Sequence, residues 1–294
     1  MPFNEKKQLD PSQVQDRRRR TTGQTIAIGG GGIGIIVLLV SMLMGVDLSE
    51  LVDVGAAAPS YSDDYYEEAV DLISECQTGA DANERQDCRL VGFVNSVQAF
   101  WEDEFQYYGM EYEPAQTVLF SGSTQAACGF ASGAMGPFYC PRDRMIYIDL
   151  SFFETIQTKF SAQGGPFAEA YVIAHEYGHH VQNLFGVLNT SGMIRDSGPD
   201  SEIVFTELQA DCLAGIWMHH ATETGYLESF TDEEIMQALD AAASVGDDRI
   251  QQQTQGRVVP DAWTHGSSEQ RLAALEDGMR SGDMDTCNTP GWEE

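Results

Sequence analysis

The chain has 294 residues, 42% of them hydrophobic, which is enough for one large or two small domains with an apolar core. Its net charge is −30, and the acidic excess lies in the main part of the chain: from Asp47 onward, ten Lys and Arg residues stand against 43 Asp and Glu. This balance argues against binding of nucleic acid or of an anionic surface by that part, and a soluble acidic surface explains it most simply.

The N-terminal part combines a basic cluster with an apolar stretch. Residues 1–22 carry six of the 16 Lys and Arg residues, including Arg17–Arg20, and the 22 residues from Thr25 to Val46 carry no charge. At ~1.5 Å per residue, such a stretch can cross a hydrocarbon core of ~30 Å. We therefore expect a cytoplasmic tail over 1–22 and a transmembrane helix over 23–46. By the positive-inside rule, the rest lies outside the cytoplasm, anchored to the cell membrane by a single pass.

Two features of this stretch leave alternatives open. A cleaved signal peptide is the competing interpretation, because the small residues from Val54 to Ser60 offer a cutting site, although the apolar run exceeds the usual signal core. Gly30 and Gly34 have the spacing of a small-residue helix contact, which makes a homodimer through this segment a candidate.

After an acidic, small-residue linker over residues 47–64, residues 65–294 are predicted to form one domain, and it contains all six cysteines. An even number of cysteines outside the cytoplasm favours disulfides, and the absence of a CxxC pair disfavours a cysteine zinc site. Closeness in sequence favours three pairs, although sequence alone leaves other pairings open. These pairs are Cys76 with Cys88, Cys128 with Cys140, and Cys212 with Cys287.

The domain is expected to begin with a helix and two strands. Apolar residues recur every three or four positions from Leu90 to Phe105, so this helix has a buried aromatic face, and it ends at Gly109. The β-rich runs 116–120 and 145–150 predict two strands of one small sheet, separated by a Gly-rich loop.

The second half of the chain has the pattern of consecutive helices. Ser151 and Glu154 have capping-box spacing, and Pro166 suits the first position of a helix that ends at Gly186. Further helices are expected after the caps Ser201, Thr231 and Ser267. Since there is no internal repeat, the predicted fold class is α+β, mainly helical with a small sheet.

The stretch YVIAHEYGHH, from Tyr171 to His180, contains a candidate metal site. His175 and His179 are four residues apart, so on a helix they project from one face and can bind one ion. Glu176 lies about 100° further round the helix, beside the ion. Chance supplies an H-E-x-x-H match in roughly one chain in a hundred of this length, so a further ligand is needed to support the prediction.

The next predicted helix offers that ligand. A catalytic zinc has three protein ligands and an open position for water. Glu207 can be the third ligand, and Asp211, one turn further on the same face, can hold an imidazole in the right tautomer. Both carboxylates lie in an otherwise apolar stretch, where unpaired carboxylates are costly.

Three stretches of the chain, IAHEYGHHVQNL, TELQADCLAGIW and THGSSEQR, resemble a known family. Together with the Gly-rich apolar segment behind a basic tail, they look like the predicted neutral zinc metallopeptidases of bacteria, single-pass membrane proteins with a zincin-type domain. The resemblance covers nearly the whole chain. It implies a zincin-like fold, one Zn²⁺ per chain bound by His175, His179 and Glu207, and Glu176 as general base. It also implies a peptide or protein substrate.

The chemistry expected from this resemblance is hydrolysis by an activated water. Zinc lowers the pKa of its water to ~7, and Glu176 takes the proton and passes it to the leaving amine. The oxyanion needs another donor, for which His265 is the candidate and Arg271 the alternative or a supporting charge, by similarity to a late segment of other membrane-anchored zincins. An extended substrate is expected to pair with an edge strand, for which residues 145–150 are the candidate.

A non-catalytic, membrane-tethered binding module that keeps the zincin fold is the alternative function. Glu176 discriminates between the two, since a structural metal site needs no general base. The other histidines of these helices, His180, His219 and His220, point away from the ligand face or close a helix, so structural roles are expected for them.

Overall fold

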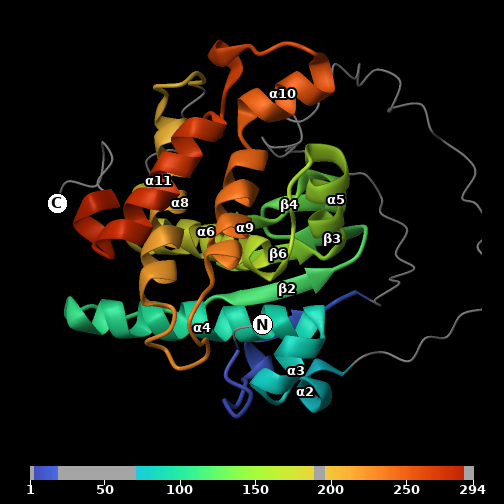
Figure 1. The fold of residues 1–294 in the computed structure, drawn as a ribbon, viewed down its shortest axis with the longest axis vertical. Coiled ribbons are helices and arrows are strands. Elements are labelled where there is room, and N and C mark those ends of the chain that lie inside the picture. Colours follow the sequence, from blue (N-terminus) through green and yellow to red (C-terminus); the bar gives the residue numbers. More distant parts are fainter. Residues whose placement is uncertain (1–2, 19–70, 189–195, 288–294) are drawn as a thin grey trace, which may run out of the picture.

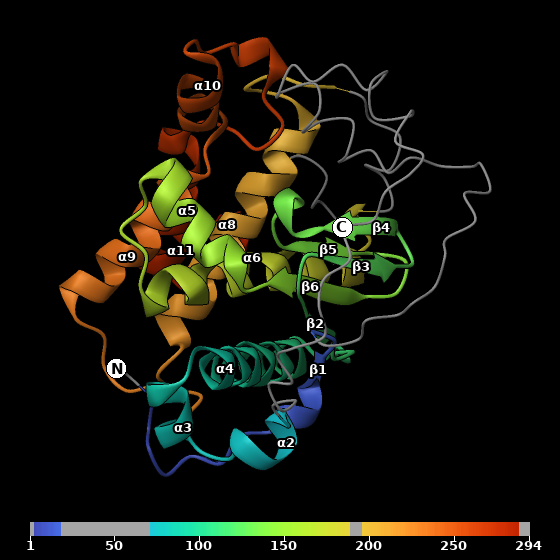
Figure 2. The ribbon, with the colours of Figure 1, turned by 90° about the vertical axis from the view of Figure 1, so that its right-hand side faces the viewer.

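The computed structural model describes residues 3–18, 71–188 and 196–287. These residues combine helices with small sheets, in agreement with the predicted α+β class. Figures 1 and 2 show α4 towards one end of the molecule and α10 at the other, with the main sheet and α6 between them.

The elements follow one another along the chain as helices and strands with short 3-10 turns. The helices are α2 (Leu72–Glu75), α3 (Gly79–Glu84), α4 (Gln86–Tyr107), α5 (Ser151–Phe160), α6 (Pro166–Leu184), α8 (Glu202–His220), α9 (Asp232–Ser244), α10 (Asp247–Gln255) and α11 (Ser268–Ser281). The strands are β1 (Val14–Asp16), β2 (Gln116–Phe120), β3 (Ser123–Ala126), β4 (Gly129–Ser132), β5 (Phe138–Cys140) and β6 (Met145–Asp149). The 3-10 turns are η1 (Pro11–Gln13), η3 (Gly133–Met135), η4 (Pro260–Ala262) and η5 (Met284–Cys287).

The main sheet has the order β1-β2-β6-β5, and β3 with β4 forms a separate hairpin. Strands β1, β2 and β6 are parallel, whereas β5 runs antiparallel to β6. The prediction that residues 145–150 form an edge strand for substrate is wrong, because β6 is paired on both sides and its backbone groups are already used. The outer strand on this side is the short β5.

Helix α6 lies at the centre of the helical part. It packs against α4, α8 and α9, and α11 lies along α8. Fully buried aromatic side chains fill the space between these helices, among them Trp101, Tyr171 and Trp217. Because α6 is enclosed by three other helices, the side chains it carries are held in fixed positions.

Most of the predicted helix starts are confirmed. The side chains that cap helices as expected are those of Ser201, Thr231 and Ser267. Pro166 is the first residue of α6, as predicted. The capping box at Ser151 is wrong, because its hydroxyl donates to the Asp149 carboxylate at 2.8 Å and Leu150 is the N-cap of α5.

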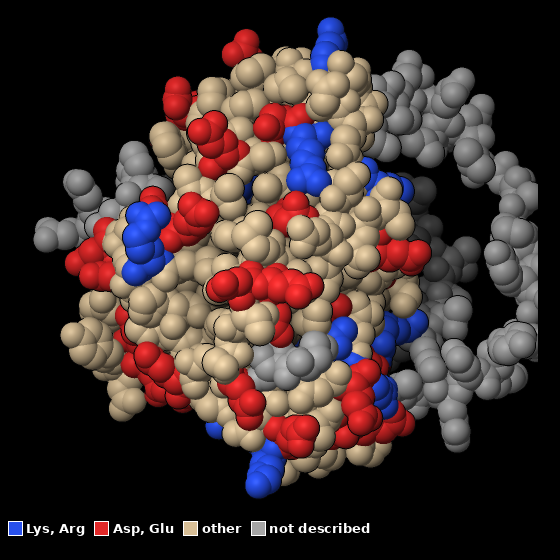
Figure 3. Space-filling model, in the orientation of Figure 1, with Lys and Arg blue, Asp and Glu red and all other residues tan. Residues whose placement is uncertain are grey.

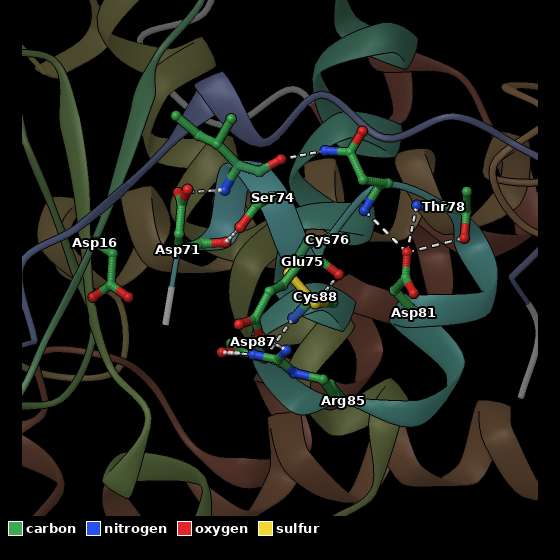
Figure 4. Close-up of a disulfide and its surroundings, with 12 residues drawn as sticks. Asp16, Asp71, Ser74, Glu75, Cys76, Thr78, Asp81, Arg85, Asp87 and Cys88 are labelled. Atoms are coloured by element: carbon green, nitrogen blue, oxygen red, sulfur yellow. Dashed lines mark hydrogen bonds and ion pairs between the residues drawn. A yellow bond between two sulfur atoms is a disulfide. The ribbon is translucent and has the colours of Figure 1, made fainter. Parts of the chain in front are cut away.

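The disulfides join the cysteines that closeness in sequence favours. They are Cys76–Cys88, Cys128–Cys140 and Cys212–Cys287. The first links the end of α2 to α4, beside the ion pairs of Arg85 with Glu75 and Asp87 (Figure 4). The third fastens the turn η5 to α8, the helix that carries Glu207.

Residues 3–18, here called the N-terminal arm, are part of the folded body. Phe3, Leu9 and Val14 belong to its hydrophobic core, and β1 extends the main sheet. The sequence predicts a separate basic tail over residues 1–22, but residues 3–18 of that tail pack against the part of the chain from residue 71 onward.

No helix within the described ranges is long and apolar enough to cross a membrane. The predicted transmembrane helix over 23–46, its glycines Gly30 and Gly34, and the linker over 47–64 lie outside those ranges. They stay predictions from the sequence.

The face of the molecule in Figure 3 has acidic side chains spread over it, with basic side chains in isolated positions among them. This distribution agrees with the strong negative net charge of the chain. A surface of this kind repels polyanions, which supports the expectation that nucleic acid is not a partner.

Candidate metal centre

The histidines of the H-E-x-x-H stretch lie on α6 and face Glu207 on α8. Nε2 of His175 is 3.3 Å from one carboxylate oxygen of Glu207, and Nε2 of His179 is 3.5 Å from the other. One ligand atom from each residue lies within 4.8 Å of the other two. The structure thus brings together the three side chains that the sequence predicts as ligands.

Gly178 allows the two ligand helices to approach one another. A Cβ atom at this position would lie 2.8 Å from the carbonyl oxygen of Ala210 on α8, which is closer than atoms pack. The glycine is therefore required by the contact between α6 and α8.

The Nδ1 atom of His175, on the side of the ring away from Glu207, contacts a buried network of charged groups. This Nδ1 is 2.7 Å from Oδ1 of Asp211, which also accepts from the Tyr171 hydroxyl at 2.6 Å. The guanidinium of Arg271 donates to both Asp211 oxygens, at 2.8 and 2.9 Å. Burial raises the pKa of Asp211, but the charges of Arg271 and His175 outweigh it and lower this pKa to about 2.

His179 is held by an uncharged network that sequence reasoning missed. Its Nδ1 is 2.8 Å from Oε1 of Gln182, one turn further along α6. The amide nitrogen of Gln182 donates to the Thr206 carbonyl at 2.7 Å and to Gln209 at 2.8 Å. The spacing of three residues from His179 was the available signal, but a buried glutamine has many other uses in a protein core.

These partners fix which nitrogen of each ring carries the proton. Asp211 is ionised and can only accept, so Nδ1 of His175 must donate to it. Gln182 uses its amide nitrogen elsewhere, so its oxygen faces His179 and accepts from Nδ1. In the neutral form of both rings, which is the form that binds a metal, the lone pair is therefore on Nε2, the atom that faces Glu207. Two imidazole nitrogens and a carboxylate oxygen with this orientation fit a zinc ion.

The charges around His175 make the site attractive to a cation. Burial alone would lower the pKa of His175, but Asp211 and Glu207 raise it to about 10. A group that holds a proton this firmly marks a region of negative potential. Because a metal ion displaces that proton, metal uptake at this site is coupled to proton release.

Glu176 is buried next to the ligands and is 7% exposed. Its Oε2 atom has no hydrogen-bond partner within the described residues. Burial raises the pKa of this carboxyl group, although the nearby His175 and His179 oppose the shift. A buried carboxyl oxygen without a partner is costly unless a ligand or water completes it, which marks Glu176 as a functional group.

His265 lies in a loop that packs on α8 beside Glu207. A Cβ atom at Gly266, which has φ +88°, would lie 3.2 Å from the Val204 side chain and 3.3 Å from that of Leu208, so the loop runs close to α8 at this position. The carboxylate of Asp247 accepts from three successive backbone N–H groups of this loop, those of Thr264, His265 and Gly266, at 2.6, 2.7 and 3.2 Å.

The same carboxylate also positions the ring of His265. The His265 Nδ1 atom is 3.3 Å from Oδ1 of Asp247, and the side chain stays 43% exposed. Burial lowers the pKa of His265, but Asp247 and Glu207 outweigh this and raise it. Like Gln182, Asp247 was not predicted from the sequence to belong to the site. It lies 18 residues before His265 in the chain, so no local pattern links the two.

Arg271 lies in the network behind His175 rather than in front of the ligands. Besides Asp211, its guanidinium donates to the Tyr171 hydroxyl at 2.9 Å, and the side chain is 4% exposed. Of the two roles considered for Arg271, this position fits the supporting charge and leaves no donor directed at a substrate.

The remaining histidines of these helices make structural contacts, as expected. His180 is fully buried between the Tyr139 hydroxyl and the Glu113 carbonyl, at 3.1 and 2.7 Å, and burial lowers its pKa to about 4. His219 contacts the Met279 carbonyl in the last turn of α11 at 2.8 Å, and His220 contacts the carbonyl of Gly282, just after that helix, at 3.0 Å.

The candidate site combines two imidazole nitrogens oriented by buried acceptors, a carboxylate as third donor and an adjacent buried glutamate. This set of groups is of the kind found in zinc hydrolases. The chain belongs to the family described as "Putative neutral zinc metallopeptidase", whose model matches residues 3–290. The match includes the N-terminal arm as well as the metal site.

Relatives of the chain are found in bacteria. It is 46% identical over 256 residues to "Uncharacterized protein Rv2575" of Mycobacterium tuberculosis, covering 85% of this chain and 84% of the relative. It is 38% identical over 297 residues to "Uncharacterized protein YpfJ" of Escherichia coli K12, covering 96% of each chain. No solved structure matches the chain.

Proposed function

We propose that the protein is a zinc-dependent peptidase with its catalytic centre between α6 and α8. The observation that carries this proposal is the combination of three convergent ligand atoms with the unpartnered, buried Oε2 of Glu176 beside them. A purely structural site would have no use for that carboxyl group.

Zinc bound by His175, His179 and Glu207 would supply a Lewis acid that polarises the scissile carbonyl and acidifies a water molecule. Glu176 takes the proton of the attacking water at Oε2 and returns it to the leaving amine. The raised pKa of its carboxyl group suits the uptake of the water proton, because a higher pKa makes the Glu176 carboxylate a stronger base.

We assign to His265 the role of donor to the oxyanion. Its Nδ1 faces Asp247, which leaves Nε2 as the outward donor of a protonated ring. Asp247 acts on the reaction through His265: it fixes the backbone of the loop and favours the charged form of the ring.

The outer edge of β5 is the best place for an extended substrate. No strand of the described part of the chain pairs with this edge, and backbone groups of an edge strand can bind a peptide main chain. The strand is fastened to the ligand helix, since the Tyr139 hydroxyl contacts His180 and accepts from Asn183 of α6 at 2.9 Å. A peptide added here would extend the main sheet at the strand that contacts α6, the helix that carries His175 and His179.

The test of this function is a Glu176→Gln variant of the full chain. We expect it to keep about one zinc per chain by metal analysis and to lose at least about 100-fold of the hydrolysis of a peptide library, because it cannot take up the water proton. Glu154→Gln, an exposed glutamate on α5, is the matched control and should change neither quantity.

His175→Ala should remove the zinc and the activity together, because it deletes a ligand. A folded wild-type chain without zinc would overturn the proposal. Bound zinc without hydrolysis of any peptide would instead support the non-catalytic binding module. Membrane attachment through residues 23–46 stays a prediction from the sequence, and fractionation of cells with an antibody against the chain tests it.

A further inference from the structure

The N-terminal arm begins with an aromatic side chain inserted into the core. Phe3 is 1% exposed, and its ring centroid is 4.9 Å from that of Phe93 on α4. A Cβ atom at Gly92 would overlap the Phe3 ring, so α4 has a notch at this position. The Phe3 backbone exchanges two hydrogen bonds with the Asn83 amide, at 3.2 and 3.0 Å.

Buried polar side chains of α4 depend on the arm for their partners. Asn95, 1% exposed, accepts from the Asp10 N–H at 2.8 Å and donates to its carbonyl at 3.0 Å. Asn95 and Gln98 both donate to the Gln13 side chain at 2.9 Å. Without the arm these two amides would lose the partners that they have inside the structure.

The arm ends as a strand of the main sheet. Val14 to Asp16 pair in parallel with Thr117 to Leu119 of β2, and the arm covers that edge of the sheet. Arg18, two residues after the end of this strand, forms ion pairs with Asp16 at 2.6 Å and with Asp87 of α4 at 3.1 Å. Figures 1 and 2 show the arm running beside α2, α3 and α4.

These contacts cannot be made across a membrane. The arm and the body touch at hydrogen-bond distance, whereas a hydrocarbon core separates its two sides by ~30 Å. A single crossing between residue 18 and residue 71 would put the arm on one side of the membrane. Its contact residues Gly92, Asn95 and Gln98 and strand β2 would then lie on the other side.

We propose that the surface formed by Gly92, Asn95, Gln98 and β2 is a docking site for the chain's own N-terminal arm, and that arm and metal-site body lie on the same side of any membrane that the chain is attached to. The expected topology, with a cytoplasmic N-terminus and an exported body, is incompatible with this docking.

The basic residues that favour a cytoplasmic N-terminus are partly engaged in the fold. Arg18 is ion-paired with two carboxylates, and the Arg17 guanidinium lies 5.8 Å from the centroid of the Tyr147 ring and donates to Gln15 at 2.8 Å. Paired arginines hold an arm to its docking site, so the charge that would orient an isolated tail serves here as part of an interface.

The topology is tested in cells with the full chain and single added cysteines. Ser12→Cys reports on the arm and Thr158→Cys on the body, because both positions are exposed. A membrane-impermeant maleimide should label both variants or neither in intact cells, and both after permeabilisation. Labelling of one without the other in intact cells would place them on opposite sides and overturn the proposal.

Docking itself is tested by thermal unfolding of the full chain. Phe3→Ala empties the Gly92 notch, and we expect the Tm to fall by about 10 °C. Glu5→Ala, at an exposed position of the same arm, is the matched control and should leave the Tm within about 1 °C. Equal Tm values for the two variants would show that Phe3 is not docked and would overturn the proposal.

Discussion

His175 and His179 face the same carboxylate but are supported in different ways. Behind His175 lies an ionised aspartate that is bonded to an arginine of α11 and to a tyrosine. Behind His179 lies a neutral glutamine whose other end is bonded to α8. Both supports leave the same nitrogen for a metal, so orientation does not require charge. The charged support adds negative potential and ties a third helix to the site.

Among changes to the groups that support the two histidines, Arg271→Met should have the largest effect. This change leaves the buried carboxylate of Asp211 without its main counter-charge, and we expect a loss of about 4 kcal/mol in the free energy of unfolding. Urea unfolding of the metal-free protein measures it.

Arg280→Met on the same helix is the matched control. Arg280 pairs with Asp277 at 3.1 Å, but their side chains are 72% and 51% exposed, so a loss below about 1 kcal/mol is expected. Similar losses in the two variants would show that burial of the Arg271–Asp211 pair does not increase its contribution to the free energy of unfolding.

The pH dependence of stability should also differ between the two supports, because Asp211 titrates and Gln182 does not. The folded pKa of Asp211 is lowered to about 2, below its unfolded value of about 4, so its stabilisation is fully present above pH ~4 and is lost as the pH falls through ~2. We expect about 2 kcal/mol from this group in the metal-free protein. Unfolding in urea between pH 2 and 5 measures the slope.

Asp211→Asn should flatten this slope, since an amide does not titrate. Gln182→Ala should leave it in place, because the support of His179 contains no ionisable group. A slope that persists unchanged in Asp211→Asn would assign the acid sensitivity to other carboxylates.

The smallest expected effect belongs to Gln182→Ala. Loss of the acceptor frees the His179 ring to rotate, and zinc affinity should fall by about 10-fold to 100-fold, as for other groups that orient a ligand histidine. Competition with a chromophoric chelator measures the affinity.

Asn183→Ala is the neighbouring control for that experiment. Asn183 donates to Tyr139 and contacts no predicted ligand, so zinc affinity should stay within about twofold. An equal fall in both variants would mean that the end of α6, rather than the Gln182 amide, positions His179.

The parts of the site that the sequence predicts are those with a local signal. His175, Glu176 and His179 follow from spacing on one helix, and Glu207 stands out as a carboxylate in an apolar stretch. Gln182 and Asp247 have no such signal, because their partners are set by tertiary packing.

The same reasoning explains the errors in the fold. Strand β6 has a clear β-rich sequence, but its neighbour β5 has three residues within a Gly-rich region, so the position of the sheet edge could not be predicted. The polar sequence of the N-terminal arm likewise hides that Phe3 and Val14 are buried.

Gly178 has a consequence for the choice of ion. Because α6 and α8 are in close backbone contact at Gly178, the ligands of the two helices could move apart to admit more donors only if this contact opened. Calcium takes about six to eight oxygen ligands in flexible shells, whereas zinc accepts about four that include imidazole. A protein exposed to millimolar calcium would therefore discriminate by the stiffness of a helix contact as well as by the chemistry of its ligands.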